Sequence, residues 1–577
     1  MRRSPLVLLL FLTLIGCAPL MAPGYFLRAH DAAHSLFWLV EFDQGIRDGF
    51  FWPRWATDHV LGYGYPLFTF YAPLAFYIAE AFHLLGASIV AAVKLTWGLA
   101  FLLSGLTMYR FASRLWGAGA GFVAGLLYAF APYHLVNIYV RAALAEFVAF
   151  ALFPWVLYCF WDLIERGGRR RLALAGLSLG LTLLTHSVTL LIFPPFLIGL
   201  ILYWLLLHRR QTGRFPWQRS FAVLLAGLLA GGMATIFLLP ALAESPYIVQ
   251  AQWLPDAYNY AKQYPYLFQL LSLDWGFGHA LPGPDDGMSQ QIGLWLFILG
   301  LAALLLLWRA RLAHRGLLAG FLAAALIAIL GMLAVTQPIW AALPPLALIQ
   351  FPFRLLAMAD LFLALTAAAV LAALLPRRPA AKTPAAPLPT PALAIGLAIV
   401  LASYPTLRPE HTPVSARNQS PAAVTDFEVA FPDMRGSTAF AGQPPIASPK
   451  LDAYLTGGTL PLAGIIAGEG EVTPTRHGGG SERVRVLART PVTLQFYTYW
   501  YPGWQGTANG EEIALRSAGP DALITLDLPA GEHDVSIRFG NTPLRTAAAL
   551  ISLFSLLLLI TLLFSDYIAY FLLRISY

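Results

Sequence analysis

Charged residues are scarce in this chain of 577 residues. Asp, Glu, Lys and Arg make up 12% of the sequence, about half the usual share in a soluble domain, while hydrophobic residues make up 58%. Long runs with almost no charge recur, and each can cross a bilayer as a helix. The composition excludes a soluble globular protein. The formal net charge of +7 indicates no nucleic-acid partner, because the Arg residues cluster in short loops between apolar runs.

Cysteine is almost absent, since Cys17 and Cys159 are the only two residues of this type. Two cysteines in or next to apolar segments exclude a disulfide framework and a zinc site built from several cysteines. The stretch Leu14-Ile15-Gly16-Cys17 matches a bacterial lipobox behind the basic Arg2-Arg3, so a lipidated start at Cys17 is one interpretation. We favour an uncleaved first membrane helix, because matches of this length are common in apolar helices.

The basic clusters predict the topology. If Pro66–Leu85 is a surface helix and not a span, every basic cluster falls on the cytoplasmic side, as the positive-inside rule requires. This count gives a multi-pass plasma-membrane protein with about twelve spans and both termini in the cytoplasm. The inner face then carries little but short basic turns, so chemistry or recognition is expected on the extracytoplasmic face. The apolar runs counted as spans are Pro5–Met21, Ile89–Met108, Ala118–Ala131, Phe147–Trp161, Leu172–Leu184, Thr189–Leu207, Phe221–Leu239, Ile292–Leu307, Gly316–Val335, Leu355–Leu375, Ala392–Ser403 and Ala547–Phe564.

Three domains follow from composition. Residues 1–403 form the multi-span membrane domain, with an outer first loop at 24–87 and a Pro/Ala-rich cytoplasmic linker at Pro379–Pro391. Residues 404–544 are rich in Gly, Pro and Thr, and polar and apolar residues alternate in their second half. This pattern predicts an extracytoplasmic β-sandwich, clear from about Arg483 and irregular before it. Residues 545–577 are the last membrane helix and a short cytoplasmic tail.

The segment from Asp31 to Asp48 predicts an amphipathic helix on the outer membrane surface. A carboxylate there could act as general base toward a hydroxyl acceptor, or hold a divalent cation against a phosphate. We expect Glu41, Asp43 and Asp48 to form an ordinary solvated face. Asp31 and His34 are different, because they lie where the first span leaves the membrane and share one helical face.

Five further residues are expected on the same outer side. Arg141 and Glu146 lie in an apolar context where charge is costly, so Arg141 either clamps a phosphate or anchors the helix at the interface with Glu146 as its partner. Arg354, at the head of a later span, is a second candidate phosphate contact. His186 caps a tight outer turn, where a histidine is as often structural as catalytic. Trp275 opens a Gly-rich aromatic loop that could be a lid or a sugar platform.

A set of motifs recurs in a characteristic order across nearly the whole chain. The order resembles a bacterial membrane family labelled 6-pyruvoyl-tetrahydropterin synthase related, with YfhO-type membrane proteins as kin. The architecture is similar to that of the GT-C superfamily of glycosyltransferases, which use polyprenyl-phosphate-linked sugars. The motifs are HD..H, WPRW, GYGYPLFTFYAPL, YVRAALAE, LTHS, LLPALAES, WGFGHALPG, QFPFR and a terminal FYTYWYPGW followed by PAGEHDVSIRFGNTPLR.

The GT-C resemblance implies an acidic catalytic base or metal contact early in the first outer loop. That role falls on Asp31, with His34 beside it. The chain departs from the superfamily pattern because it has no paired acids of the Asp-X-Asp kind. If a divalent cation takes part, Asp31 is its contact; neither a pterin nor a nucleotide cofactor is expected. A pterin synthase needs a soluble scaffold with a three-histidine zinc site, and the scattered outer histidines do not fit one.

Three functions are weighed. The first is a GT-C-like glycosyltransferase that moves a sugar from a polyprenyl phosphate or diphosphate to an envelope glycan, lipid or protein. The second is a non-catalytic envelope protein that binds glycan or organises assembly through its β domain. The third is a transporter, which is disfavoured because the sequence shows no clear polar trail through the spans. The first predicts that Asp31→Asn abolishes transfer; the second predicts that this change is silent.

Overall fold

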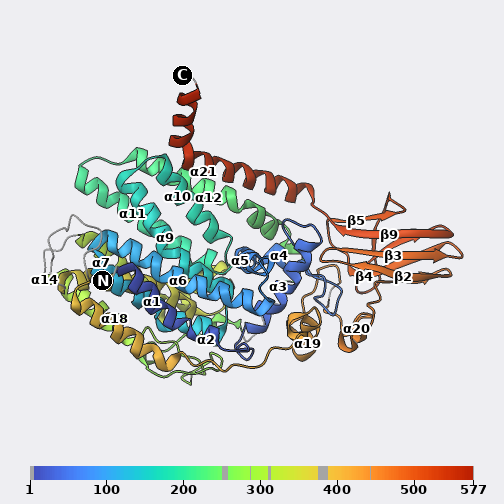
Figure 1. Cartoon of the computed structure of the whole chain (residues 1–577), viewed down its shortest axis with the longest axis horizontal. Helices are drawn as coiled ribbons and strands as arrows, with labels where there is room; N and C mark the ends of the chain where they lie inside the picture. Colours follow the sequence, from blue (N-terminus) through green and yellow to red (C-terminus); the bar gives the residue numbers. More distant parts are fainter. Residues whose placement is uncertain are drawn as a thin grey trace.

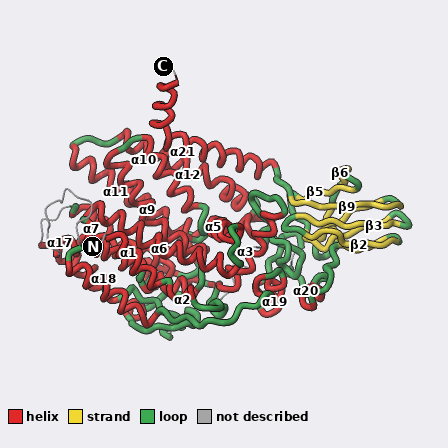
Figure 2. The backbone as a smooth tube through the Cα atoms, viewed as in Figure 1, coloured by secondary structure: helices red, strands yellow, loops and turns green. Residues whose placement is uncertain are grey.

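A computed structural model describes residues 5–249, 258–285, 287–309, 314–374, 388–441 and 443–575. A bundle of helices makes up most of the molecule, and the β strands gather at one end of its long axis (Figures 1 and 2). The helices α3, α4 and α5 lie between the strands and the rest of the bundle (Figure 1). Arg2-Arg3 and most of the expected linker at Pro379–Pro391 lie outside the described residues.

The helices confirm a multi-pass architecture. Six of them are long and apolar enough to cross a membrane, or up to eight spans if each of two bent helix pairs counts as one, among the described residues. The predicted number of about twelve is not confirmed by this criterion, because several expected spans, such as α1 and α10, form helices of only 12 and 15 residues. The α-helices are α1 (Pro5–Gly16), α2 (Ala18–Met21), α3 (Ala32–Arg47), α4 (Leu67–Phe70), α5 (Leu74–Leu84), α6 (Ile89–Trp116), α7 (Ala118–Ala129), α8 (Pro132–Val136), α9 (Leu144–Arg166), α10 (Arg169–Leu183), α11 (Thr189–Thr212), α12 (Trp217–Ala243), α13 (Leu267–Leu271), α14 (Leu294–Arg309), α15 (Arg315–Gly331), α16 (Gln337–Ala342), α17 (Leu356–Leu374), α18 (Thr390–Ser403), α19 (Ala422–Ala430), α20 (Leu451–Thr456) and α21 (Pro543–Ile575).

The centre of the bundle is formed by α6, α7, α9 and α17, which pack against one another. The helices α6 and α7 approach closely at two glycines: a Cβ added to Gly125 would lie 2.8 Å from the backbone oxygen of Gly105. Small residues allow this approach in a membrane, where helix association depends on close packing. The buried face of α9 runs from Leu144 to Ile164, so this helix is enclosed on most sides.

Basic residues collect at the end of the bundle that lies away from the first loop. Arg114, in the last turn of α6, lies over the ring of Trp161 in α9. Asp162 of α9 forms an ion pair with Arg171 of α10 at 2.6 Å. The opposite end of α6 follows α5, against which it packs, and α6 also contacts α3. The basic end and the loop end are therefore distinct.

The strands form two antiparallel sheets. One has the order β1-β4-β8-β7 and the other β2-β3-β9-β5-β6. Alternation is clearest in β3, where Val484 and Val486 are buried and face Val535 and His533 of β9. The strand pattern expected from Arg483 onward is confirmed, but the sheets begin earlier, at Ala463. The strands are β1 (Ala463–Ala467), β2 (Gly470–His477), β3 (Ser481–Ala488), β4 (Val492–Tyr499), β5 (Trp504–Ala508), β6 (Glu511–Ile513), β7 (Arg516–Ala518), β8 (Leu523–Leu528) and β9 (Gly531–Phe539).

The expected amphipathic helix of the first loop is α3, but its acidic face is not solvated as predicted. Glu41 is fully buried, and Asp48, just after the helix, is 6% exposed. Asp48 accepts hydrogen bonds from Arg476 at 2.5 Å and from Ser481 at 2.6 Å, because the turn between β2 and β3 covers it. Asp43 is half-buried and pairs with the exposed Arg47 at 2.6 Å. The prediction of a solvent-exposed face is therefore wrong for Glu41 and Asp48.

Candidate active site

The first loop docks on the chain just before α9. The backbone N–H of Asp31 donates to the carbonyl oxygen of Arg141 at 2.8 Å, and the N–H of His30 donates to Val140 at 3.2 Å. Asp31 occupies the N-cap position of α3, but its carboxylate makes no capping hydrogen bond. The docking brings the start of α3 next to Arg141.

The backbone at Arg141 is unusual. Residues Asn137–Arg141 form a π-helical turn, and Ala142 follows with a φ of +52°, in the left-handed region. This region is strained for a residue with a side chain, and π-turns and strained residues concentrate at functional sites. The turn follows α8 and precedes α9, so Arg141 ends the turn and Glu146 lies in the first turn of α9.

Arg141 and Glu146 form a buried ion pair with a tyrosine. The Arg141 Nη1 atom lies 2.9 Å from Glu146 Oε2 and donates to Tyr133 Oη at 2.8 Å. Tyr133 in turn donates its hydroxyl proton to Glu146 Oε1 at 2.7 Å. Arg141 is 4% exposed and Glu146 2% exposed. Glu146 is therefore the partner of Arg141, and both charges are held away from water.

Arg354 approaches the same carboxylate without a hydrogen bond to it. Its Nε atom lies 3.9 Å from Glu146 Oε2 and is buried with no hydrogen-bond partner. Its Nη1 atom donates to the carbonyl oxygen of Ile349 at 3.1 Å. Two guanidinium groups thus face the Glu146 carboxylate, and the Nε–H group of Arg354 is left without an acceptor and can donate to an anion.

The fourth charged residue of the candidate active site, after Arg141, Glu146 and Arg354, is Asp31. Its side chain is half-buried, and among the described residues its carboxylate takes part in no hydrogen bond or ion pair. It interacts electrostatically with Arg141 and Arg354. A carboxylate without a partner beside two guanidinium groups can accept a proton from a hydroxyl group or contact a bound cation.

His186 joins the group from the turn between α10 and α11. It is 7% exposed, and its Nδ1 atom is buried without a hydrogen-bond partner. Burial lowers the pKa of His186 to about 4, so its imidazole is neutral at pH 7; Glu146 opposes this shift, while Arg354 and Arg141 add to it. A neutral imidazole with one free nitrogen can donate or accept a hydrogen bond.

The other two expected residues are His34, in the first turn of α3, and Trp275, in the loop after α13. His34 packs against the rings of Phe427 and Trp38, at 4.5 and 5.1 Å between centroids, and burial lowers its pKa. Trp275 has a buried Nε1 atom without a partner and packs against Phe277. Its loop reaches the first loop through His279, whose ring stacks on His30 at 4.1 Å.

Two tyrosines of the site were missed by sequence reasoning. Tyr133 bridges Arg141 and Glu146, and it lies eight residues before Arg141 in the same expected outer loop. Tyr71 lies beside His186, with 6.2 Å between ring centroids, and burial together with Asp31 raises its pKa. A search for hydroxyl groups in the outer loops would have found Tyr133. No three His, Cys, Asp or Glu side chains of the described ranges converge as metal ligands.

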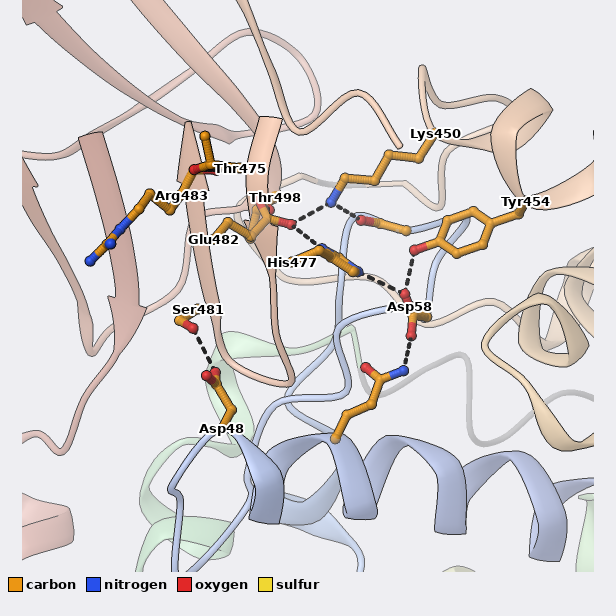
Figure 3. A network of polar contacts seen from close by, with 12 residues as sticks. Asp48, Asp58, Lys450, Tyr454, Thr475, His477, Ser481, Glu482, Arg483 and Thr498 are labelled. Carbon is orange, nitrogen blue, oxygen red and sulfur yellow. Dashed lines mark hydrogen bonds and ion pairs between the residues drawn. The ribbon is translucent and has the colours of Figure 1, made fainter. Parts of the chain in front are cut away.

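A second polar cluster joins the first loop to the β sheets (Figure 3). Asp58 lies 3.0 Å from His477 Nε2, and the His477 Nδ1 atom lies 3.2 Å from Glu482. Lys450 pairs with Glu482 at 2.7 Å and donates to the carbonyl oxygen of Gly62 at 2.8 Å. We call Asp58, His477, Glu482 and Lys450 the docking network.

Each charge of the docking network faces an opposite charge. Burial opposes the charged form of His477, but hydrogen bonds to Asp58 and Glu482 raise its pKa to about 9. Burial likewise opposes the ionised form of Asp58, yet the bond to His477 keeps the pKa of Asp58 at about 2. Lys450 is fully buried and Glu482 is 2% exposed. This arrangement fixes the β sheets on the first loop and leaves no charge open to a ligand.

Comparisons with solved structures gave partial matches to transferases. The arabinofuranosyltransferase AftD from Mycobacteria is 17% identical over 70% of this chain and 27% of its own, with a TM-score of 0.43. The arabinosyltransferase EmbB from Mycobacterium smegmatis is 10% identical over 93% of this chain and 63% of its own, with a TM-score of 0.34. ArnT from Cupriavidus metallidurans is 15% identical over 62% and 76%, with a TM-score of 0.25.

Sequence comparison identifies the family. A Lactococcus lactis subsp. cremoris (strain MG1363) protein described as uncharacterized is 24% identical over 249 residues, which are 41% of this chain and 39% of that protein. The match therefore spans well under half the length of this relative. The model of a membrane-protein family described as a 6-pyruvoyl-tetrahydropterin synthase related domain matches residues 68–408. Because this match covers more than half of the sequence, the chain belongs to the 6-pyruvoyl-tetrahydropterin synthase related family of membrane proteins.

Proposed function

We propose that this protein is a GT-C-like glycosyltransferase that takes a sugar from a polyprenyl phosphate or diphosphate on the extracytoplasmic face. The acceptor is an envelope glycan, lipid or protein. One observation carries the proposal: the carboxylate of Asp31 has no partner among the described residues, and it lies beside two arginines that share Glu146. A base and a cationic phosphate site side by side are what sugar transfer from a phosphate requires.

The proposed reaction uses each of these groups once. Asp31 removes the proton from an acceptor hydroxyl, and the hydroxyl oxygen attacks the anomeric carbon of the donor sugar. The bond between that carbon and the phosphate oxygen breaks, and the phosphate leaves with the electron pair. Arg141 and Arg354 face the charge that develops on the phosphate. Asp31 then releases its proton to water.

The remaining expected residues take supporting roles. The neutral imidazole of His186 offers a free Nδ1 atom for a hydrogen bond to the donor. His34 interacts electrostatically with Asp31, and we assign it to positioning that carboxylate. Trp275 is our candidate for stacking on a sugar ring. The loop end of the bundle would face outward and the basic end the cytoplasm, in agreement with the positive-inside rule.

The central test is Asp31→Asn in membranes that contain the full chain. With a panel of polyprenyl-phosphate sugars as donors, we expect transfer to fall at least about a hundredfold, because loss of a general base costs about that much. Asp43→Asn is the matched control, since Asp43 lies on the same helix and pairs only near the surface. Full transfer by the Asp31→Asn variant would refute the assignment.

The same assay separates a base from a metal ligand. If Asp31 acts as base, transfer by the wild type continues in EDTA. If Asp31 holds a divalent cation against the donor phosphate, EDTA stops transfer and added Mg²⁺ or Mn²⁺ restores it. If instead the Asp31→Asn variant stays active while deletion of residues 404–544 removes function, the β domain is the functional part and the protein is a non-catalytic envelope component.

One observation favours a transporter as the second candidate. Asp360 in α17 is fully buried, and both of its carboxylate oxygens lack hydrogen-bond partners. His134 and Asn137 are also fully buried with both polar atoms unpartnered. Polar groups of this kind inside a bundle are typical of proton or substrate pathways. A transporter predicts that Asp360→Asn abolishes proton-coupled uptake, whereas a transferase predicts that this change leaves sugar transfer close to the wild-type rate.

A further inference from the structure

Arg54 is a buried cation outside the candidate active site. It lies in the WPRW motif between α3 and α4, and the residue is 5% exposed. Its Nη2 atom donates to the carbonyl oxygen of Ile236 in α12 at 2.8 Å. Its Nε and Nη1 atoms are buried and have no hydrogen-bond partner. Most of the donor groups of this guanidinium are thus unused, which is costly for a buried cation.

No carboxylate of the described residues neutralises Arg54. The acidic group that acts on it electrostatically is Glu244, but Glu244 is already held by Arg545 at 2.7 and 2.8 Å. Tyr501 donates a further hydrogen bond to Glu244 at 3.2 Å. Burial and the nearby Arg545 lower the pKa of Arg54 to about 10, so it still carries its charge at pH 7. Two cations and one anion leave an excess of one positive charge here.

Arg54 lines a small cavity between the first loop and the β sheets. The other walls include the rings of Phe50, Trp52 and Trp55 and the backbone of Gly479 and Gly480. The indole Nε1 atoms of Trp52 and Trp55 are also buried without acceptors. Three residues that line the cavity, Arg54, Trp52 and Trp55, thus carry buried donors that lack acceptors, and a hydrogen-bond acceptor that reached these donors would satisfy them.

A second cation, Arg538, contacts Phe50, which is one of the residues that line the cavity. The guanidinium of Arg538, from β9, lies 4.2 Å from the ring centroid of Phe50 and donates to the backbone oxygen of Asp48 at 3.2 Å. A Cβ on Gly480 would come within 2.8 Å of Phe50, so the absence of a side chain at Gly480 keeps this ring in place. A fork of guanidinium donors, with a second arginine packed on a lining residue, suits a phosphate group.

The position of the cavity indicates where such a phosphate would come from. Ile236 is two turns before the end of α12 at Ala243, one of the helices that can span a membrane. Phe51 and Leu242 near this level are 81% and 74% exposed, as is typical of side chains that face lipid. If α12 crosses the bilayer, this end of the helix lies near the lipid headgroups.

We propose that Arg54 binds the phosphate group of a membrane lipid, at a site built from different residues than the Arg141 and Arg354 pair. This inference does not depend on the transferase proposal. A free phosphate ion has the same chemistry, and the experiment distinguishes the two sources.

The test is thermal unfolding of the delipidated full chain in a detergent that contains no phosphate. The probes are a short-chain phosphatidic acid and inorganic phosphate, added separately, and the proteins are the wild type, Arg54→Gln, Arg354→Gln and the double variant. We expect phosphatidic acid to stabilise the Arg354→Gln variant. The same concentration should not stabilise the double variant, because loss of Arg54 weakens the affinity of the protein for phosphatidic acid about tenfold or more. Arg28→Gln is the matched control, because Arg28 is an exposed outer arginine whose partner, Glu410, lies outside the cavity.

The outcomes are separable. If phosphatidic acid stabilises the protein and this effect requires Arg54, the proposal is supported. If only inorganic phosphate stabilises the protein, the ligand is a soluble phosphate and the lipid proposal is overturned. If Arg54→Gln does not fold, Trp52→Phe keeps the ring and removes one donor, and we expect it to weaken phosphatidic acid binding severalfold. If neither probe shifts the melting temperature of the Arg354→Gln variant, the proposal is overturned, and no Arg54 variant is needed to show it.

Discussion

Two buried ionic clusters meet the first loop, and they differ in one respect. In the docking network, Asp58, His477, Glu482 and Lys450 pair in sequence, so each charge has an opposite charge beside it. In the candidate active site, Arg354 and Asp31 have charged atoms without hydrogen-bond partners among the described residues. Both clusters are shielded from water and both join segments far apart in the chain.

The difference indicates what each cluster is for. A buried ion is tolerated when its hydrogen-bonding capacity is met, and a cluster that meets it internally has nothing left for a ligand. A cluster that leaves donors and a carboxylate unmatched is incomplete without one. Matched charges therefore indicate assembly in this protein, and unmatched charges indicate binding. The following predictions test that rule.

The largest expected effect comes from breaking the docking network. Lys450→Met removes the cation that pairs with Glu482 and leaves a buried carboxylate with less compensation. We expect a loss of about 3–5 kcal/mol in the free energy of unfolding, measured by denaturant or thermal unfolding in detergent. Arg489→Met is the matched control in the same sheet: its pair with Glu471 is exposed, so we expect a change below about 1 kcal/mol. Equal losses in the two variants would contradict the rule.

The next effect is the pH dependence of docking. The pKa of His477 is about 9 in the folded protein against an ordinary value of 6.5. Its contribution is therefore fully present below about pH 6.5 and is lost as the pH rises through 9, up to about 3 kcal/mol in all. Unfolding measured from pH 6 to pH 10 should show this decline in the wild type. His477→Gln should flatten the curve over the same window; an unchanged slope would show that another group titrates.

The smallest effect on stability is expected in the candidate active site. Arg354→Gln removes a buried cation whose Nε has no hydrogen-bond partner, so we expect the unfolding temperature of the unliganded protein to change little. Sugar transfer should nevertheless fall about tenfold to a hundredfold, because a donor to the leaving phosphate is lost. If the Arg354→Gln variant unfolds as easily as Lys450→Met and each folded molecule transfers sugar at the normal rate, then Arg354 has a structural role.

Local patterns in the sequence predicted local structure well. The charge-poor runs indicated a multi-pass bundle, the apolar spacing after Asp31 indicated α3, and alternation after Arg483 indicated strands. We expected Asp31, Arg141, Glu146, His186 and Arg354 to converge because the predicted topology placed them on one side, and the structure brings them together. Their roles in catalysis stay predictions.

Long-range partners could not be predicted. Asp48 and Asp58 are buried because Arg476 and His477 reach them from 428 and 419 residues away, and no periodicity in the sequence records such contacts. The number of spans is not confirmed either, because an apolar run does not show where a helix bends or ends. The bent pairs, with breaks at Ala131 and at Leu333, are examples.

The helix α3 gives the two clusters a mechanical connection. It begins directly after Asp31 and ends directly before Asp48, and its 16 residues form a stiff rod of about 24 Å. One end of the rod lies beside Arg141, and the other is held by the turn between β2 and β3. A small tilt of the β sheets on the bundle would therefore be passed along α3 to Asp31, whose backbone N–H is bonded to the carbonyl oxygen of Arg141.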